Sequence, residues 1–314
     1  MSTPTKAAAA EAAAQVADGF DRQIRAELAA GVSAGRSVPK LLGLIANDDK
    51  GAAMYARWTG RACQRNGVEF ELRKVERVNL EDAVIAANDD ASVHGIIVYY
   101  PVFGGAIDDY IRDVISASKD VEGLNHRYRY ALYHNIRYLD DGGLPDYLDE
   151  RAAGAAPRRK KCIVPCTPLA CIKILEHLGA YDESHPVSER LIGKTALVYN
   201  RSEVVGRPLA AMLANDGALV YSVDITGILV YRRGRVKGTL KVEETSVTPE
   251  KALTEADIVI SGARRRDCAE ISGGSSRNSI SALQACPRRA SRWTRRASRR
   301  APSRSISRAR RCIG

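Results

Sequence analysis

The chain has 314 residues, of which 45% are hydrophobic and 27% charged, with a formal net charge of +11. This length suffices for two domains with separate cores, because single cores seldom grow much beyond a couple of hundred residues. No apolar run approaches the roughly 18 residues that a spanning helix needs, which excludes a helical membrane protein and favours a soluble one.

The positive charge is concentrated in one part of the chain. Residues 263–314 contain 15 Arg, no Lys and 2 acidic residues, so residues 1–262 carry a net charge of −2. The globular part therefore gives no electrostatic reason to expect a nucleic-acid partner.

The N-terminal segment is rich in alanine and contains a single basic residue, Lys6, with the acidic residues Glu11 and Asp18. Targeting peptides are usually Arg-rich and poor in acids, so this segment predicts a helix, and a cytoplasmic location is expected. The 7 cysteines include no Cys-x-x-Cys pair. This pattern favours free thiols over disulfides or a metal site.

Hydrophobic periodicity predicts alternating helices and strands in the first half of the chain. We expect helices at about 5–30, 50–66 and 79–89, and strands at 40–46, 68–75 and 94–100, the last stopped by Pro101. This alternation implies a parallel sheet covered on both faces, so the fold class is α/β. Residues 140–161 predict a surface loop, and a helix running to about Leu178 is expected to join two domains.

A second series of elements begins at Gly193. A strand through Tyr199, a loop over 200–208, a helix ending near Asp216 and a strand ending at Asp224 form one βαβ unit. A basic insert follows, and 255–262 predict another buried strand. The loop would present backbone N–H groups and a helix N-terminus to a pyrophosphate.

Asp224 follows Gly206 by about 18 residues, at the end of the second strand of this unit. A carboxylate there can accept hydrogen bonds from a ribose 2′-hydroxyl and would repel a 2′-phosphate, which favours NAD over NADP. The Gly-x-Gly-x-x-Gly fingerprint is absent. An ordinary α/β connection and a solvated Asp therefore stay open as alternatives.

Four segments carry a family resemblance: Val98–Pro101, Lys119–Gly123, Pro165–Pro168 and Asn200–Pro208. They resemble, in the same order, the two folate-flanking segments, the domain-joining motif and the cofactor loop of the methylenetetrahydrofolate dehydrogenase/cyclohydrolase family. The resemblance implies a three-layer α/β folate-binding domain (1–163) and a Rossmann-like NAD-binding domain (164–262). It also implies a tetrahydrofolate substrate, NAD as cofactor, no metal and a homodimer.

The pterin-facing segment of that family is Tyr-x-x-x-Lys, and here Tyr55 is followed by Thr59 at the Lys position. Residues four apart share a helix face, so Tyr55 can cover the pterin while residue 59 faces the reacting carbon. The Gln and the acid that act with the Lys correspond to Tyr99 and Glu122. Without the Lys, no obvious group is left to activate water, so cyclohydrolase activity is expected to be weak or absent. The chain most resembles the monofunctional NAD-dependent branch, which also has Thr, Tyr and Glu at these places.

The resemblance also assigns the other site residues. Glu122 is expected to tolerate the positive charge that develops as hydride leaves, and Cys166 is expected to line the site without acting as a nucleophile. The residues expected to bind the cofactor are Asn200, Arg201, Ser202, Val205, Gly206, Pro208, Asp224 and Gly262. Among the first-domain residues, Tyr55, Tyr99 and Glu122 are each more easily explained by packing or turn formation when taken alone, and their joint order carries the assignment.

Residues 263–314 depart from the family pattern, which continues with further strands, a Pro-Gly-Gly loop and a final helix. We expect a disordered or frame-shifted tail, and translation of the other two reading frames past codon 262 tests this. An inactive product stays open, as does a nucleic-acid-binding arm, although Trp293 is its one aromatic residue. A different dehydrogenase, of the shikimate or amino-acid type, would need a catalytic Lys that the Tyr55 region lacks.

Overall fold

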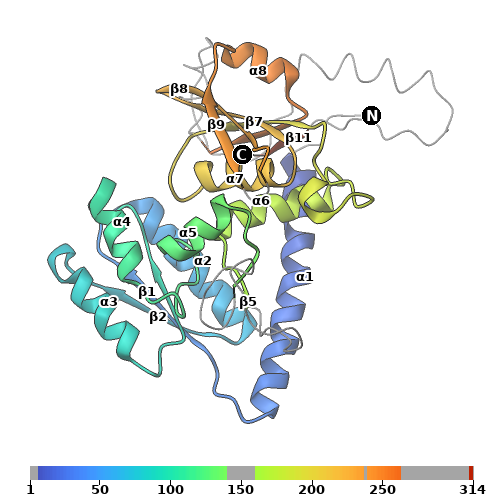
Figure 1. Ribbon diagram of the computed structural model, residues 1–314. Coiled ribbons are helices and arrows are strands. Elements are labelled where there is room, and N and C mark those ends of the chain that lie inside the picture. Colours follow the sequence, from blue (N-terminus) through green and yellow to red (C-terminus); the bar gives the residue numbers. More distant parts are fainter. Residues whose placement is uncertain (1–5, 140–159, 237–238, 263–310, 314) are drawn as a thin grey trace, which may run out of the picture. The chain divides into compact units, whose positions relative to one another are not determined.

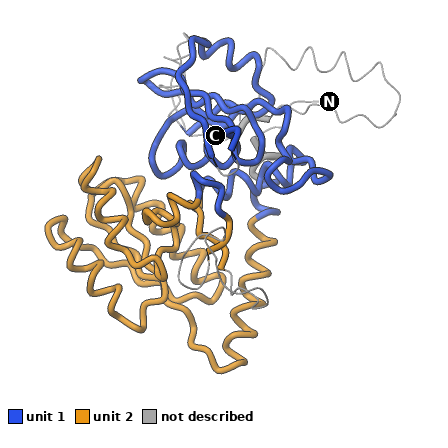
Figure 2. The backbone as a smooth tube through the Cα atoms, in the orientation of Figure 1, with its two compact units in different colours: residues 1–16, 132–136, 167–314 blue, residues 17–131, 137–166 orange. Residues whose placement is uncertain are grey.

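The computed structural model describes residues 6–139, 160–236, 239–262 and 311–313 (Figure 1). The chain divides into two compact units, which Figure 2 colours separately. Unit 1 comprises residues 1–16, 132–136 and 167–314, and unit 2 comprises residues 17–131 and 137–166. Each unit has its own sheet and its own core.

Unit 2 is built on a three-stranded parallel sheet with strand order β2-β1-β3. Its strands are β1 (Lys40–Ile45), β2 (Glu69–Lys74) and β3 (Gly95–Val98). Helix α2 (Lys50–Asn66) connects β1 to β2, and α3 (Leu80–Asp89), preceded by the 3-10 turn Arg77–Asn79, connects β2 to β3. Helices α4 (Gly105–Val114) and α5 (His126–Tyr133) follow, and α1 (Lys6–Ser33) precedes β1. A short antiparallel pair, β4 (Tyr138–Leu139) and β5 (Lys160–Lys161), lies after α5.

Helices cover both faces of this sheet. Leu42 and Leu44 of β1 pack with Val84 of α3 and Ile111 of α4 on one face. The alternate residue Ile45 packs on the other face with the small residues of α2, Ala52 among them. Alternate strand residues point to opposite faces, so nearly continuous apolar strands require this three-layer arrangement.

Unit 1 contains a six-stranded sheet with strand order β11-β10-β6-β7-β8-β9. Its strands are β6 (Thr195–Tyr199), β7 (Leu219–Asp224), β8 (Gly227–Arg233), β9 (Leu240–Glu244), β10 (Ile258–Ser261) and β11 (Arg311–Ile313). β11, β10, β6 and β7 are parallel, whereas β8 and β9 extend the sheet as antiparallel strands. The helices are α6 (Cys166–His177), α7 (Gly206–Asn215) and α8 (Pro249–Glu255), with a 3-10 turn at Val187–Glu189.

The sheet of unit 1 is also covered on both faces. Val198 and Ile260 pack with Leu209 and Leu213 of α7 and with Leu175 of α6. On the opposite face, a cluster that includes Leu197, Tyr221 and Val223 packs with Ala252 of α8. Full burial of a side chain of this size contributes about 1.5–3 kcal/mol, so these contacts define the core. The α/β fold class expected from the sequence is confirmed.

The alternating elements predicted from β1 to β3 and from β6 to β7 are present, as are the predicted helix α6 and the predicted strand β10. The sequence pattern did not indicate α4 or α5, and it identified the segment that forms β8 and β9 only as a basic insert. Most of the predicted loop at 140–161 and of the predicted tail at 263–314 lies outside the described residues. Within the tail, residues 311–313 form β11, which the pattern did not indicate.

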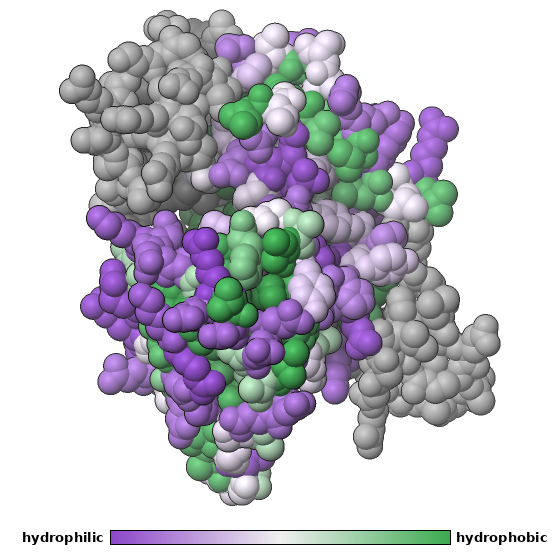
Figure 3. Space-filling model, turned by 90° about the vertical axis from the view of Figure 1, so that its left-hand side faces the viewer, coloured by the Kyte–Doolittle hydropathy of each residue, from purple (hydrophilic) through white to green (hydrophobic). Residues whose placement is uncertain are grey.

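In the part of the chain that the structure describes, no helix has the length and apolar character needed to cross a membrane. Hydrophilic and hydrophobic residues are interspersed on the face shown in Figure 3. No group of three or more His, Cys, Asp or Glu side chains that could hold a metal ion occurs among the described residues.

Candidate active site

Helix α2 presents Tyr55 and Thr59 on one face. The helix begins after Asp49, whose carboxylate accepts a hydrogen bond from the Ala52 N–H at 2.7 Å. The Thr59 hydroxyl donates to the Tyr55 carbonyl at 3.0 Å, as expected for residues four apart. The Tyr55 side chain is 38% exposed, so its ring is accessible on one side.

Loss of the Asp49 cap is expected to destabilise unit 2. Asp49→Ala removes the acceptor for an N–H in the first turn of α2, and such substitutions cost about 1 kcal/mol. Thermal unfolding measured alongside Asp48→Ala provides the comparison, because the Asp48 side chain is 91% exposed and pairs with Lys74 at the surface. Equal melting temperatures for the two variants would contradict this role of Asp49.

Tyr99 follows β3 and meets Tyr55. The two rings pack edge to face, with centroids 5.8 Å apart and planes at 84°. Tyr99 is 2% exposed, and its buried hydroxyl has no hydrogen-bond partner among the described residues. Burial raises the pKa of Tyr99 to about 12, against a smaller opposing effect of the Thr59 hydroxyl. The Tyr99 hydroxyl is therefore enclosed near Thr59, and it stays protonated at neutral pH.

The turn at 119–125 is organised by Asp120. Its carboxylate accepts hydrogen bonds from the N–H groups of Glu122 and Gly123, both at 2.9 Å, and of Asn125 at 2.8 Å. Burial raises the pKa of Asp120, although these N–H groups favour its charged form. Gly123 has φ 65°, and a Cβ there would lie 2.7 Å from the Ile163 carbonyl oxygen. The turn is therefore rigid, and it fixes the backbone of Glu122.

The Glu122 carboxyl forms no hydrogen bond or ion pair within the part of the chain that the structure describes. Burial, followed by the negative charge of Asp120, raises its pKa to about 8, and the positive charge of Arg112 opposes the shift. The carboxyl is therefore mainly protonated at neutral pH in the free protein. A cation bound beside it would favour the ionised form.

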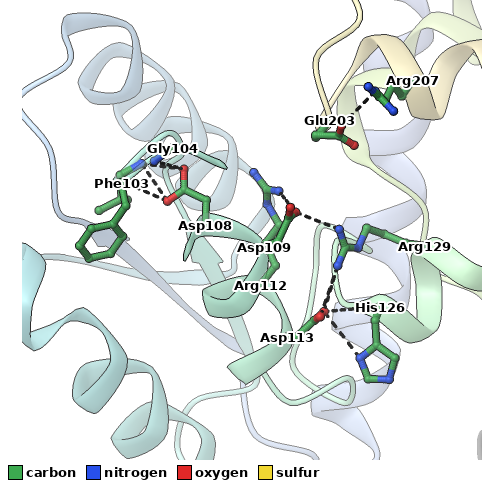
Figure 4. Close-up of polar contacts among 11 residues, drawn as sticks. Phe103, Gly104, Asp108, Asp109, Arg112, Asp113, His126, Arg129, Glu203 and Arg207 are labelled. Carbon is green, nitrogen blue, oxygen red and sulfur yellow. Dashed lines mark hydrogen bonds and ion pairs between the residues drawn. The ribbon is translucent and has the colours of Figure 1, made fainter. Parts of the chain in front are cut away.

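Arg112 belongs to a charged network that the sequence pattern did not reveal (Figure 4). Its guanidinium is 6% exposed and lies 4.6 Å from the centroid of the Tyr100 ring. It pairs with Asp109 at 2.6 Å, which also contacts Arg129 at 2.9 Å. Arg129 also forms an ion pair with Asp113 at 3.3 Å. The i, i+3 spacing of Asp109 and Arg112 is the one feature of the sequence that could have indicated the network.

Cys166 begins α6. Its side chain is exposed, and its thiol donates to the Val121 carbonyl at 3.5 Å. Desolvation by the protein around the sulfur, followed by the charges of Glu122 and Asp120, raises its pKa to about 11. A thiol that stays protonated at neutral pH is a poor nucleophile, in agreement with a lining role.

In unit 1, Asn200 connects the ends of two parallel strands. It has φ 77°, and its side-chain amide donates to the Gly262 carbonyl at 3.3 Å. The chain crosses from β6 to β7 on one side, and β10 lies on the other side of β6. The strand order therefore reverses at this edge, which is where open α/β sheets bind their ligands.

The loop between β6 and α7 closes tightly. The Asn200 side-chain oxygen accepts from the Ser202 N–H at 2.8 Å, and the Ser202 hydroxyl accepts from the Gly206 N–H at 3.3 Å. A Cβ at Gly206 would overlap the Asn200 carbonyl oxygen. Val205 caps α7, and Pro208 lies buried in its first turn, where a missing N–H costs nothing. The helix N-terminus formed in this way carries positive partial charge, which suits a diphosphate.

Asp224 and Arg201 hold the turn between β7 and β8, and Arg201 itself lies in the loop between β6 and α7. The Asp224 carboxylate accepts from the Arg201 N–H at 2.8 Å and the Ile225 N–H at 2.7 Å. The Arg201 guanidinium donates to the Ser222 and Gly227 carbonyls, at 2.8 and 2.7 Å, and contacts the Ser222 and Thr226 hydroxyls. Arg201 thus holds the turn, while each Asp224 oxygen keeps a lone pair for a further donor.

Comparisons with known proteins show the family to which the chain belongs. The sequence model of the tetrahydrofolate dehydrogenase/cyclohydrolase catalytic domain matches residues 12–122. A methylenetetrahydrofolate dehydrogenase (NAD+) of Dictyostelium discoideum is 53% identical over 224 residues, covering 71% of this chain and 67% of that protein. The corresponding protein of Schizosaccharomyces pombe is 44% identical over 252 residues, covering 80% of this chain and 73% of that protein.

A solved structure extends the comparison to the fold. The NAD-dependent 5,10-methylenetetrahydrofolate dehydrogenase from Saccharomyces cerevisiae matches with a TM-score of 0.70 and 43% sequence identity. The match covers 80% of this chain and 77% of that chain, so it includes residues of both units. With this identity over most of each relative, the chain belongs to the tetrahydrofolate dehydrogenase/cyclohydrolase family, as its motifs predicted.

Proposed function

We propose that this chain oxidises 5,10-methylenetetrahydrofolate to 5,10-methenyltetrahydrofolate with NAD⁺ and does not hydrolyse the product. The observation that carries the proposal is its 44–53% identity to relatives named as NAD-dependent methylenetetrahydrofolate dehydrogenases. Thr59 at the position of the family's Lys agrees with it.

Unit 2 would bind and orient the folate. The partly exposed ring of Tyr55 offers an apolar face to the pterin, and the buried Tyr99 ring holds it by an edge-to-face contact. As hydride leaves the bridging carbon, the two flanking nitrogens share the positive charge. The Glu122 carboxyl, having released its proton to solvent, stabilises that charge as a carboxylate, which lowers the barrier.

The absence of hydrolysis follows from the protonation states. Hydrolysis of the methenyl cation needs a base to take a proton from water. The Tyr99 hydroxyl and the Cys166 thiol, with pKa values raised to about 12 and about 11, stay protonated at neutral pH. The Glu122 carboxylate would be paired with the methenyl cation once that cation has formed, so it is not free to act as the base. Thr59 offers only a hydroxyl that already donates to Tyr55.

Unit 1 would hold NAD, and its residues fit that group. Gly206, Ser202 and Val205 shape the start of α7 for the diphosphate, and Asn200 and Gly262 line the point where the strand order reverses. Bound NAD⁺ supplies the hydride acceptor. The Asp224 carboxylate can accept hydrogen bonds from ribose hydroxyls.

Asp224→Ser is expected to relax the preference for NAD. The substitution removes the negative charge that would repel a 2′-phosphate, so kcat/KM for NADP should rise about 10-fold relative to NAD, a shift of about 1.4 kcal/mol. Ser222→Ala is a control in the same strand, because it alters one Arg201 contact without changing charge. An unchanged ratio of the two cofactors in Asp224→Ser would contradict this role.

Oxidation of 5,10-methylenetetrahydrofolate by the purified full chain, compared with NAD and NADP, tests the proposed function. We expect NADH formation with accumulation of the methenyl product. Activity with NADP alone, rapid hydrolysis of the methenyl product, or no oxidation with either cofactor would contradict it.

We also propose the domain limits 1–163 for folate and 164–262 for NAD, and a frame-shifted or disordered origin for 263–314. The proposed location is the cytoplasm, which the free cysteines support. A homodimer is proposed from the family resemblance. The molar mass of the full chain in solution, measured by light scattering, would test it.

A further inference from the structure

Asn47 stands directly after β1, between the segments that carry Tyr55 and Tyr99. It is 8% exposed. Its amide nitrogen donates to the Tyr99 carbonyl at 2.7 Å and to the Pro101 carbonyl at 2.8 Å. Its amide oxygen accepts from the Asp49 N–H at 3.1 Å. Both donor hydrogens and the oxygen are therefore used by the backbone of two separate segments.

On one side, Asn47 continues the pairing of the sheet. β1 and β3 are paired as far as Leu44 and Val98, and the Tyr99 N–H still donates to the Leu44 carbonyl at 3.0 Å. Beyond that point, the Asn47 side chain supplies the hydrogen bonds. The backbone of Tyr99 is thus held at its N–H by the sheet and at its carbonyl by Asn47.

On the other side, Asn47 orients the start of α2. It binds the N–H of Asp49, and Asp49 in turn caps the helix through the Ala52 N–H and accepts from the Ala53 N–H at 3.0 Å. The same helix carries Tyr55 and Thr59. One buried amide therefore links the N-terminus of the helix to the loop that carries Tyr99.

We propose that Asn47 is a positioning residue for the dehydrogenase reaction, since it fixes the edge-to-face arrangement of Tyr55 and Tyr99 that receives the pterin. This inference rests on the proposed function. The two rings come from different elements, and Asn47 hydrogen-bonds to both of the segments that lead to them. Because hydride transfer depends steeply on placement, a displacement of about 1 Å can cost about 100-fold in rate.

The test compares Asn47→Ala and Asn47→Asp with Asn88→Ala. Asn88 is a matched control, because its amide donates to the Val114 carbonyl at 2.8 Å and accepts from the Ser116 N–H at 2.9 Å, without contacting either tyrosine segment. In Asn47→Ala we expect kcat/KM for 5,10-methylenetetrahydrofolate to fall about 10- to 100-fold. The KM for NAD should change by less than about twofold, and Asn88→Ala should keep both constants within the same limit.

Asn47→Asp preserves shape but sets a carboxylate oxygen against two carbonyl oxygens, so it should lose at least as much activity as Asn47→Ala. If Asn47→Ala does not fold, the kinetic constants of Asn47→Asp test the role of Asn47 instead. A merely structural role would lower the melting temperature without raising the primary deuterium isotope effect on hydride transfer, whereas misplacement of the folate should raise it.

The outcomes separate the two proposals. A folded Asn47→Ala or Asn47→Asp with wild-type kcat/KM and isotope effect would overturn the role of Asn47 alone. A wild-type chain that does not oxidise 5,10-methylenetetrahydrofolate would overturn the proposed function, and the role of Asn47 in it.

Discussion

Gly206→Ala is expected to abolish NAD-dependent turnover. The added Cβ would overlap the Asn200 carbonyl oxygen, which belongs to rigid backbone. The loop must therefore move away from the N-terminus of α7, and the Asn200–Gly262 and Ser202–Gly206 hydrogen bonds would be strained. We expect kcat/KM for NAD to fall by about 100-fold or more, since a displacement of about 1 Å has that effect.

The matched control is Gly19→Ala. Gly19 lies within α1 and a Cβ there meets nothing within 4 Å, so alanine should be neutral or stabilise the helix by about 0.5–1 kcal/mol. Steady-state kinetics with varied NAD, together with thermal unfolding, measures both effects. Gly206→Ala with wild-type kinetics would show that the loop does not bind the cofactor.

Glu122→Gln should have the second large effect, on rate and on its pH dependence. The amide cannot ionise beside the cation that forms, and loss of one such electrostatic group costs about 100- to 1,000-fold in kcat. The wild-type kcat/KM should rise with pH to a plateau above about 8, where the carboxyl ionises in the free protein. In Glu122→Gln this limb should disappear. A variant with the wild-type profile would exclude Glu122 as the titrating group, and Glu69→Gln serves as an exposed control on β2.

The same pKa shift makes a prediction about stability. Glu122 has a pKa of about 8 in the folded protein against 4.5 for the unperturbed group. The folded state therefore binds the proton more tightly, so this contribution is fully present below pH 4.5 and is lost as the pH rises toward 8. Denaturant unfolding at several pH values should show a smaller decline across this window for Glu122→Gln than for the wild type.

The alternating core elements could be predicted because apolar periodicity is strong there. Strands β3 and β6 were predicted directly from the sequence, because each is a short run of apolar residues that is buried in the fold. Strands β8 and β9 were not predicted, because their charged residues hide the apolar pattern of a strand. They lie toward one edge of the sheet, where polar side chains are tolerated. Helix α4 was not predicted, because it begins at a Gly-Gly pair, Gly104 and Gly105, that is typical of a turn.

The candidate site could be predicted in part. The spacing of Tyr55 and Thr59 placed them on one helix face, and the family motifs indicated Tyr99 and Glu122. The sequence did not reveal Asn47, because its partners Tyr99 and Pro101 lie 52 and 54 residues away along the chain. It did not reveal that Arg112 lies over Tyr100, although the i, i+3 spacing of Arg112 and Asp109 is visible in it. The neutral state of Glu122 also depends on burial, which local sequence does not encode.

The backbone of the turn at 119–125 is held by Asp120 and not by the neighbouring Glu122. The scaffold and the reacting group are thus assigned to different residues. A single substitution at position 122 can change the acid strength, length or charge of the side chain that we propose faces the substrate, while the turn persists. Such a separation makes this position evolvable: one step in sequence can alter the chemistry without a second step to rebuild its support.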